Sequence, residues 1–531
     1  MVINKNINIF KNSNRKVNIL LILTLFAVIS KIFLLGNGML SNPDEWRYLH
    51  AIRAVKMLSA GEVKECLYSI FSTDGRPGEV IIKMIPATIQ IIFSDIVKLN
   101  ILETNAFIPV YLFNFVIYLL LLIVHFRFTL LISESKTVSL LSVLLYATLT
   151  NSSLYLRHNF PYDLSLLIFY YVIYSLVKAL KNNESGDIFY IKKGILGFFA
   201  YLIYPGYVFL FVVCLGLIAL NQSQGKLRRI RQITYFLIGC GILLTLAELA
   251  SRIGGRPYIV NAFILSGTII QGSFEETLTF VFKYLWQVEG FMGLLILVGL
   301  AVYLWIHKNQ LLKSQENIIL ITLILLMLLH GVLGLFFHKI VFYGRLLHQY
   351  LPFLTVFSII GISEMLFRRF PQTLFILAAC SALNSVVGVY NLHNVRYPRD
   401  YAWSFLNLYG YYNINQYYGF NHAHTAFPKL DNVSNDYGTL QELDSIGLGK
   451  YNADIKNRKY LMVNSCFILP SNKSSIDYFG LFDKNGYTHV IDSSRHYINL
   501  KAYQFEGYKI EERKFLDSVR PRLYFLARNY K

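Results

Sequence analysis

Long apolar segments, separated by short polar ones, occupy most of the chain from residue 18 to residue 391. An α-helix needs roughly 20 apolar residues to cross the hydrocarbon core of a bilayer. The pattern therefore predicts a polytopic α-helical membrane protein with about eleven transmembrane helices. The crossings are expected near residues 18–36, 106–126, 137–156, 162–180, two within 194–221, 232–250, 288–306, 317–337, 346–366 and 372–391.

One apolar segment, EVIIKMIPATIQIIFSDIVK at residues 79–98, carries charge. It contains Lys83, Pro86, Asp95 and Lys98, and charged side chains are costly within hydrocarbon. We therefore expect it to form a helix along the membrane interface, in a first outer loop that covers residues 37–105.

The segment 194–221 requires two helices instead of one. It lies between Lys192 and Lys193 on one side and the basic run KLRRIR at 226–231 on the other. Both basic segments favour the cytoplasmic side of a membrane, and a single crossing would separate them. We expect two short helices broken at Pro205 and Gly206, because proline and glycine interrupt membrane helices.

Basic residues also orient the rest of the chain. The net charge is +19, but the lysines and arginines gather mainly in loops on one side of the predicted crossings, as in cytoplasmic loops. The net positive charge therefore gives no reason to expect a nucleic acid partner. Residues 1–17 are expected in the cytoplasm. Residues 392–531 are expected outside, where strand-like runs such as KYLMVNSCFIL and THVID predict a small α/β domain.

Composition agrees with a multi-pass protein of the plasma (inner) membrane surrounded by membrane lipids. Of all residues, 55% are hydrophobic and only 15% are charged, and the mean hydropathy is +0.44, which excludes an ordinary soluble protein. No small-x-small cleavage site follows the first apolar run, so it is not expected to be a signal peptide. The five cysteines lack metal-ligand spacing. Neither a metal site nor a disulfide framework is predicted.

Three polar sites meet the predicted outer boundary of the membrane. They are SNPDEWRYLH with Asp44 and Glu45, LRHNFPYD with Arg157, His158 and Asp163, and HKIVFYGRLLHQYLP with Lys339, Arg345, His348 and Tyr350. A carboxylate can accept a proton from a hydroxyl group, and an arginine can hold a phosphate through charge-assisted hydrogen bonds. Together they suit a reaction that activates a nucleophile and holds an anionic group.

Each site also has a purely structural interpretation. Asn42 could cap a helix whose first turn contains Asp44 and Glu45, and FPYD has the same arrangement around Asp163. Arg345 could be an anchor at the interface, although basic residues are scarcer on the outer side. The two histidines could simply be packing residues.

The order of these parts resembles the membrane glycosyltransferases of the GT-C type, in the branch of protein O-mannosyltransferases and aminoarabinose transferases (glycosyltransferase family 39). The resemblance covers residues 18–366. It rests on PDEWRY after the first crossing, the helix at 79–98, Asp163 after LRHNFP, and the arginine in YGRLLHQYLP. It implies a GT-C fold, a polyprenyl-phosphate sugar donor, and inverting transfer to a hydroxyl of a glycan, lipid or protein acceptor on the outer face.

The same resemblance assigns roles to the candidate residues. Asp44 would be the general base or orient the acceptor, with Glu45 in support, and Asp163 would shape the substrate pocket. Arg345 would hold the lipid phosphate. Further candidates for substrate binding are Arg157, His348 and Tyr350. The branch generally uses no divalent metal, so no metal or other cofactor is expected.

Some features depart from the family. The first outer loop has only Pro77 where a doubled proline is common, and the C-terminal segment has no WWDYG-like signature, which argues against transfer of an oligosaccharide to asparagine.

Other functions stay open. A broken helix and Glu248 near the end of a crossing also suit a transporter or lipid flippase. A membrane-anchored scaffold that acts through residues 392–531 is a third possibility. The sequence names neither the sugar nor the acceptor.

Overall fold

The computed structural model describes most of the chain, in two compact units. The described residues are 14–40, 42–73, 75–182, 186–221, 224–269, 278–310, 314–337, 343–367, 369–397, 401, 414–417, 460–464, 486–508 and 510–528. Unit 1 combines Met1–Leu35, Arg47–Leu99 and Ile108–Val389, and unit 2 combines Gly36–Trp46, Asn100–Phe107 and Tyr390–Lys531.

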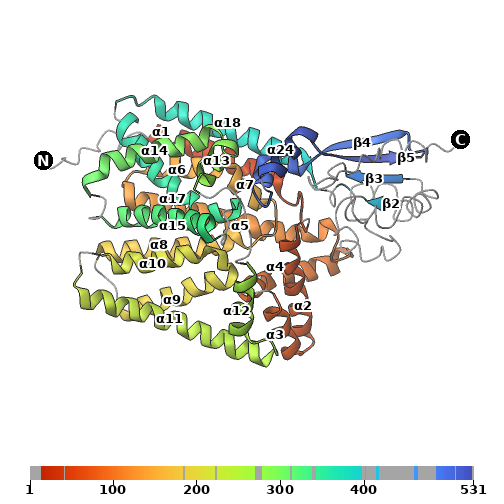
Figure 1. Ribbon diagram of the computed structural model, residues 1–531, viewed down its shortest axis with the longest axis horizontal. Helices are drawn as coiled ribbons and strands as arrows, with labels where there is room; N and C mark the ends of the chain where they lie inside the picture. The colour runs from red at the N-terminus through yellow and green to blue at the C-terminus, as the bar shows by residue number, and fades with distance from the viewer. Residues whose placement is uncertain are drawn as a thin grey trace. The chain divides into compact units, whose positions relative to one another are not determined.

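Unit 1 is built from α-helices (Figure 1). They are α1 (Asn14–Ser30), α2 (Arg47–Ser59), α3 (Val63–Phe71), α4 (Pro77–Val97), α5 (Ile108–Ser133), α6 (Lys136–Thr148), α7 (Thr150–Leu156), α8 (Tyr162–Asn182), α9 (Asp187–Ile203), α10 (Val208–Ala219), α11 (Lys226–Ile253), α12 (Tyr258–Ile269), α13 (Phe280–Gln287), α14 (Phe291–His307), α15 (Gln315–Phe337), α16 (Gly344–Leu347), α17 (Leu351–Ile362) and most of α18 (Thr373–His393). Single 3-10 turns extend α1 (Lys31–Leu34) and precede α10 (Pro205–Tyr207).

Seven helical segments in the described residues are long and apolar enough to cross a membrane. They are Lys16–Leu34, Pro77–Val97, Asn105–Ser133, Tyr162–Asn182, Lys226–Ile253, Gln315–Phe336 and Thr373–His393. The bent pair α6 and α7 would add an eighth span, and three shorter apolar helices cover Pro205–Ala219, Phe291–His307 and Leu351–Phe367. This is the architecture of an integral membrane protein. The total of about eleven crossings stays a prediction.

The break predicted within 194–221 is present, because a single turn that begins at Pro205 separates α9 from α10. Asp187 at the start of α9 pairs with Arg231 near the start of α11. Farther along, a Cβ on Gly194 would lie 1.9 Å from the carbonyl oxygen of Phe236. The helices α9 and α11 are therefore parallel and in close contact, and α10 returns the chain in the opposite direction alongside α8 (Figure 1). Both basic segments lie at the same end of these helices, as expected.

The helix α4 confirms that the charged apolar segment is helical and shows where its charge lies. Lys83 is only 2% exposed and donates to Glu79 Oε1 (2.7 Å) and to the carbonyl oxygen of Asn159 (2.6 Å). The exposed side of α4 is mainly apolar and carries Ile81, Ile85, Ile89, Ile92 and Ile96, with Asp95 exposed near its C-terminal end. Because Lys83 is paired within the protein, its charge does not exclude a span.

The packing of α3 and α4 supports the interfacial position, which stays a prediction. Gly78 in the first turn of α4 packs against the backbone of Leu202 and Ile203 at the end of α9. Gly254, directly after α11, packs against Tyr68 of α3 in the same way. The two helices thus meet the ends of α9 and α11 and cross them (Figure 1), as helices along an interface would.

Unit 2 contains the small C-terminal sheet that the strand-like runs predicted. Its strands are β1 (Val395–Arg396), β2 (Ile414–Tyr417), β3 (Tyr460–Asn464), β4 (His489–His496) and β5 (Arg522–Ala527), in the order β1-β4-β5-β3-β2. Strand β5 is antiparallel to β3 and β4, whereas β1 is parallel to β4 and β2 to β3. The short helices α23 (Lys501–Gln504) and α24 (Ile510–Val519) connect β4 to β5. The side of the membrane on which this sheet lies stays a prediction.

Acid is expected to destabilise this sheet through His496. The side chain is fully buried at the end of β4, and its Nδ1 accepts the N–H of Ile498 (3.2 Å). Burial lowers the pKa of His496 to about 3, whereas an unfolded histidine titrates near 6.5. The stability that depends on the neutral ring is therefore complete above pH 6.5 and falls as the pH drops below it, by about 2 kcal/mol at pH 5.

Hydrogen exchange of the full chain measures this effect. After correction for intrinsic exchange rates, protection of β4 and β5 should fall between pH 7.5 and pH 5 in the wild type. The variant His496→Asn keeps an acceptor that does not titrate, and its protection should be much less sensitive to pH. Equal protection of the wild-type strands at both pH values would contradict the prediction.

Candidate functional site

The bend between α6 and α7 brings a short polar helix into the interior of unit 1. The two helices meet at Leu149 at an angle of 64°, and α7 begins with the polar run TNSS at residues 150–153. Asn151 and Ser152 are fully buried. Ser152 Oγ lies 3.0 Å from the carbonyl oxygen of Tyr146 and 2.9 Å from that of Leu149. The hydroxyl thus places a hydrogen-bond donor beside the carbonyl groups at the bend, which helps to make a buried break tolerable.

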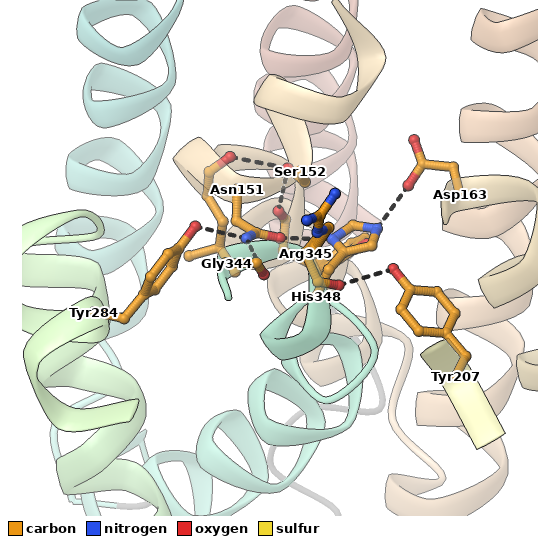
Figure 2. Close-up of polar contacts among 10 residues, drawn as sticks. Asn151, Ser152, Asp163, Tyr207, Tyr284, Gly344, Arg345 and His348 are labelled. Atoms are coloured by element: carbon orange, nitrogen blue, oxygen red, sulfur yellow. Dashed lines mark hydrogen bonds and ion pairs between the residues drawn. The ribbon is translucent and has the colours of Figure 1, made fainter. Parts of the chain in front are cut away.

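His348 lies between a carboxylate and an amide (Figure 2). Its Nε2 is 2.8 Å from Asp163 Oδ1, and its Nδ1 is 2.6 Å from Asn151 Oδ1. His348 is fully buried and Asp163 is 9% exposed. Two predicted site residues that are 185 positions apart thus form one pair, which we call the carboxylate–imidazole pair.

Arg345 belongs to the same cluster (Figure 2). It lies on α16, a helix of four residues that ends directly before His348. Its Nη1 donates to the hydroxyl of Tyr162 (3.3 Å), the neighbour of Asp163, and its guanidinium lies 4.7 Å from the ring centroid of Tyr343. The side chain is partly exposed. Arg345 therefore places a positive charge beside the carboxylate–imidazole pair, and a ligand can approach this charge.

Arg157 and His158 lie in the loop between α7 and α8, and both are almost completely buried. The loop is held through its main chain, because Asn114 Nδ2 donates to the carbonyl oxygen of His158 (3.3 Å) and Lys83 to that of Asn159. Arg157 is thus less accessible to a ligand than Arg345.

Of the two remaining predicted residues, the structure places one. Tyr350 is fully buried at the N-cap position of α17, where Pro352 is in the first turn. Lys339 lies outside the described residues.

Asp44 and Glu45 belong to unit 2, in the turn Pro43–Trp46. The N–H of Asp44 donates to Asn42 Oδ1 (2.9 Å), and the N–H of Asn42 donates to Glu45 Oε2 (2.9 Å). These reciprocal bonds form a capping box, so the helix-start interpretation is confirmed for Asn42 and Glu45. Glu45 is fully buried, whereas Asp44 is partly exposed. The convergence of Asp44 with the cluster of unit 1 stays a prediction, because the contacts above lie within single units.

Sequence reasoning missed a buried support behind α7. Glu289, which is 3% exposed, accepts the N–H of Thr150 (2.7 Å) and of Asn151 (2.9 Å) with its two oxygens. Lys31, fully buried after α1, donates to Ser153 Oγ and acts electrostatically on Glu289. Charged and polar residues within predicted crossings are costly and functional more often than not. A lysine in the first crossing and the run TNSS in a later one were signals that could have identified this support.

The arrangement can hold an anion and share a proton. Arg345 can pair with a negatively charged ligand, and the carboxylate–imidazole pair lies among the rings of Tyr155, Tyr162 and Tyr207. In the part of the chain that the structure describes, no group of three or more His, Cys, Asp or Glu residues is placed to hold a metal ion.

Comparison with known proteins adds evidence on the fold. No protein-family model and no curated protein matches the sequence. The structure is similar to ArnT from Cupriavidus metallidurans, both in the apo state and bound to undecaprenyl phosphate. In each case the TM-score is 0.50, the identity is 12%, and the match covers 96% of this chain and 98% of ArnT. ArnT is an aminoarabinose transferase of the GT-C family. The resemblance inferred from sequence is thus confirmed at the level of the fold: the chain has the GT-C fold of ArnT.

Proposed function

We propose that the protein is a glycosyltransferase that moves a sugar from a polyprenyl-phosphate donor to an acceptor hydroxyl on the outer face of the membrane. The observation that carries this proposal is a partly exposed arginine beside a carboxylate–imidazole pair, within a fold that matches ArnT over nearly its whole length. The solved structure of ArnT with undecaprenyl phosphate supports a donor of that class. The sugar and the acceptor are open.

In the proposed reaction, the acceptor oxygen attacks the anomeric carbon while the bond from that carbon to the phosphate oxygen breaks. Inversion follows from this single displacement. Negative charge grows on the departing phosphate, and Arg345 would stabilise it more strongly in the transition state than in the ground state. Asp44 would take the acceptor proton, with Glu45 holding its turn. Asp163 would shape the pocket through His348.

A transporter or lipid flippase receives less support. Glu248, the residue that favoured it, pairs with Arg252 on its own helix (2.8 Å) and accepts the N–H of Ile259 (2.9 Å). The second contact joins α11 to α12, which is a structural role. A scaffold that acts only through the C-terminal domain does not explain the buried polar cluster of unit 1.

A donor assay tests the proposal. The purified protein in liposomes is incubated with radiolabelled polyprenyl-phosphate sugars and an extract of cell-envelope acceptors, and loss of label from the lipid is followed. We expect one donor to lose its label only when protein and acceptor are both present. Retention of label on every donor, combined with movement of the lipids between leaflets, would favour the flippase.

Replacement of Arg345 with alanine is expected to lower the transfer rate by about 10²- to 10³-fold, because one positive contact to the departing phosphate is lost. The variant Arg345→Lys keeps the charge without the planar fork and should lose less. Arg252→Ala, at the exposed end of α11, serves as the control with near wild-type transfer. Full activity of Arg345→Ala would remove Arg345 from the donor site.

A further inference from the structure

The amide of Asn151 has one chemically consistent orientation. Its Nδ2 faces the carbonyl oxygen of Gly344 (3.2 Å) and the hydroxyl of Tyr284 (2.6 Å). A carbonyl oxygen only accepts hydrogen bonds. If the amide were turned over, its oxygen would face the Gly344 oxygen and repel it. Asn151 Oδ1 therefore faces His348, as Figure 2 shows.

This orientation determines what His348 must carry. Asn151 Oδ1 is an acceptor without a proton, and it lies 2.6 Å from Nδ1 of His348. A hydrogen bond at that distance requires a proton on Nδ1. The ring is also fixed through its backbone, because the N–H of His348 donates to the same Gly344 oxygen (3.1 Å).

The other ring nitrogen then needs a proton as well. Nε2 lies 2.8 Å from Asp163 Oδ1. A neutral ring that carries its proton on Nδ1 has a bare lone pair on Nε2, and an ionised carboxylate offers only lone pairs. Two lone pairs at this distance repel each other. One further proton must therefore lie between Nε2 and Asp163, either on the ring or on the carboxyl group.

We propose that Asn151 is a positioning residue that keeps Nδ1 of His348 protonated, so that His348 and Asp163 hold one additional proton between them. In either arrangement of that proton the pair has no net charge. Asp163 then does not cancel the positive charge of Arg345. If the proposed function holds, this is how the cluster keeps a net positive charge for the donor phosphate with a carboxylate so close by.

Nitrogen-15 NMR of the histidine-labelled full-length protein in liposomes tests the inference without any substrate. Comparison with His348→Gln identifies the signals of His348 among the twelve histidines. At pH 7.5 we expect Nδ1 to carry a directly bonded proton and Nε2 to show a shared or bonded proton. A bare Nδ1 in the wild type would overturn the proposal.

A variant and a matched control assign the effect to Asn151. Asn151→Leu removes the acceptor and keeps a side chain of similar size. His348 can then lose the proton at Nδ1 and become neutral, with its remaining proton on Nε2. Ser152→Ala changes the adjacent buried residue, which bonds the Tyr146 and Leu149 carbonyls instead, and should leave the His348 signals unchanged. Wild-type signals in a folded Asn151→Leu protein would overturn the role of Asn151. Expected signals combined with no transfer from any donor would reject the proposed function and keep this inference.

Discussion

Asp44→Asn is expected to lower sugar transfer by about 10²- to 10⁴-fold, the range over which a general base accelerates proton transfer. Asparagine has the shape of aspartate but cannot take the acceptor proton. The capping bonds of this turn should be preserved, because they use the side chains of Asn42 and Glu45 and only the backbone of Asp44. Single-turnover transfer from a labelled donor, together with thermal unfolding, measures both quantities.

The capping residue offers the complementary control. Asn42→Ala removes the acceptor of the Asp44 N–H and should lower stability by about 1 kcal/mol with little direct effect on the chemical step. The two variants thus separate the catalytic from the structural interpretation of NPDE. Wild-type transfer by Asp44→Asn would mean that another group takes the proton.

Glu289→Ala is expected to have the largest effect on stability, about 3 to 5 kcal/mol, because removal of a buried carboxylate leaves the buried groups around it uncompensated. Two backbone N–H groups at the start of α7 would also lose their acceptors, and the Lys31 ammonium would lose its counter-charge. Thermal unfolding in one detergent measures the effect. Glu316→Ala, which breaks a more exposed pair with Lys181, should cost about 1 kcal/mol or less.

A double-mutant cycle tests whether Lys31 and Glu289 act as a pair. Lys31→Met combined with Glu289→Gln removes both charges at similar volume. We expect the double variant to be more stable than the sum of the two single effects predicts. Simple additivity would show that Glu289 acts only as the cap of α7.

Hydropathy predicted most of unit 1 because a helix in a membrane must satisfy its backbone internally and turn apolar side chains outward. The break at Pro205 followed from charge, since two basic segments had to share one side. The position of α4 relative to the membrane was harder to predict. Hydropathy averaged over a window of residues counts Lys83 as unfavourable in a membrane. In the folded chain, however, Lys83 is paired with Glu79 and the Asn159 carbonyl.

The site was only partly predictable. Asp163, Arg345 and His348 could be chosen because polar residues at the predicted boundary are few, and they do form one cluster. Their mutual contacts could not be predicted, since they depend on α7 and its bend at Leu149. Nor does the sequence distinguish Arg157, which is fully buried, from Arg345, which a ligand can reach. That distinction depends on how neighbouring helices pack around each side chain.

The short helix α16 positions two groups of the site at once. Arg345 lies in this helix and His348 follows it directly, so one short piece of backbone positions both the guanidinium and the imidazole. The turn is held on both sides by hydrogen bonds. The Gly344 carbonyl accepts one from Asn151 Nδ2, and the Arg345 carbonyl accepts one from the hydroxyl of Tyr207 (3.2 Å). An anion captured by Arg345 would therefore be bound by the same short turn that holds His348 against Asp163.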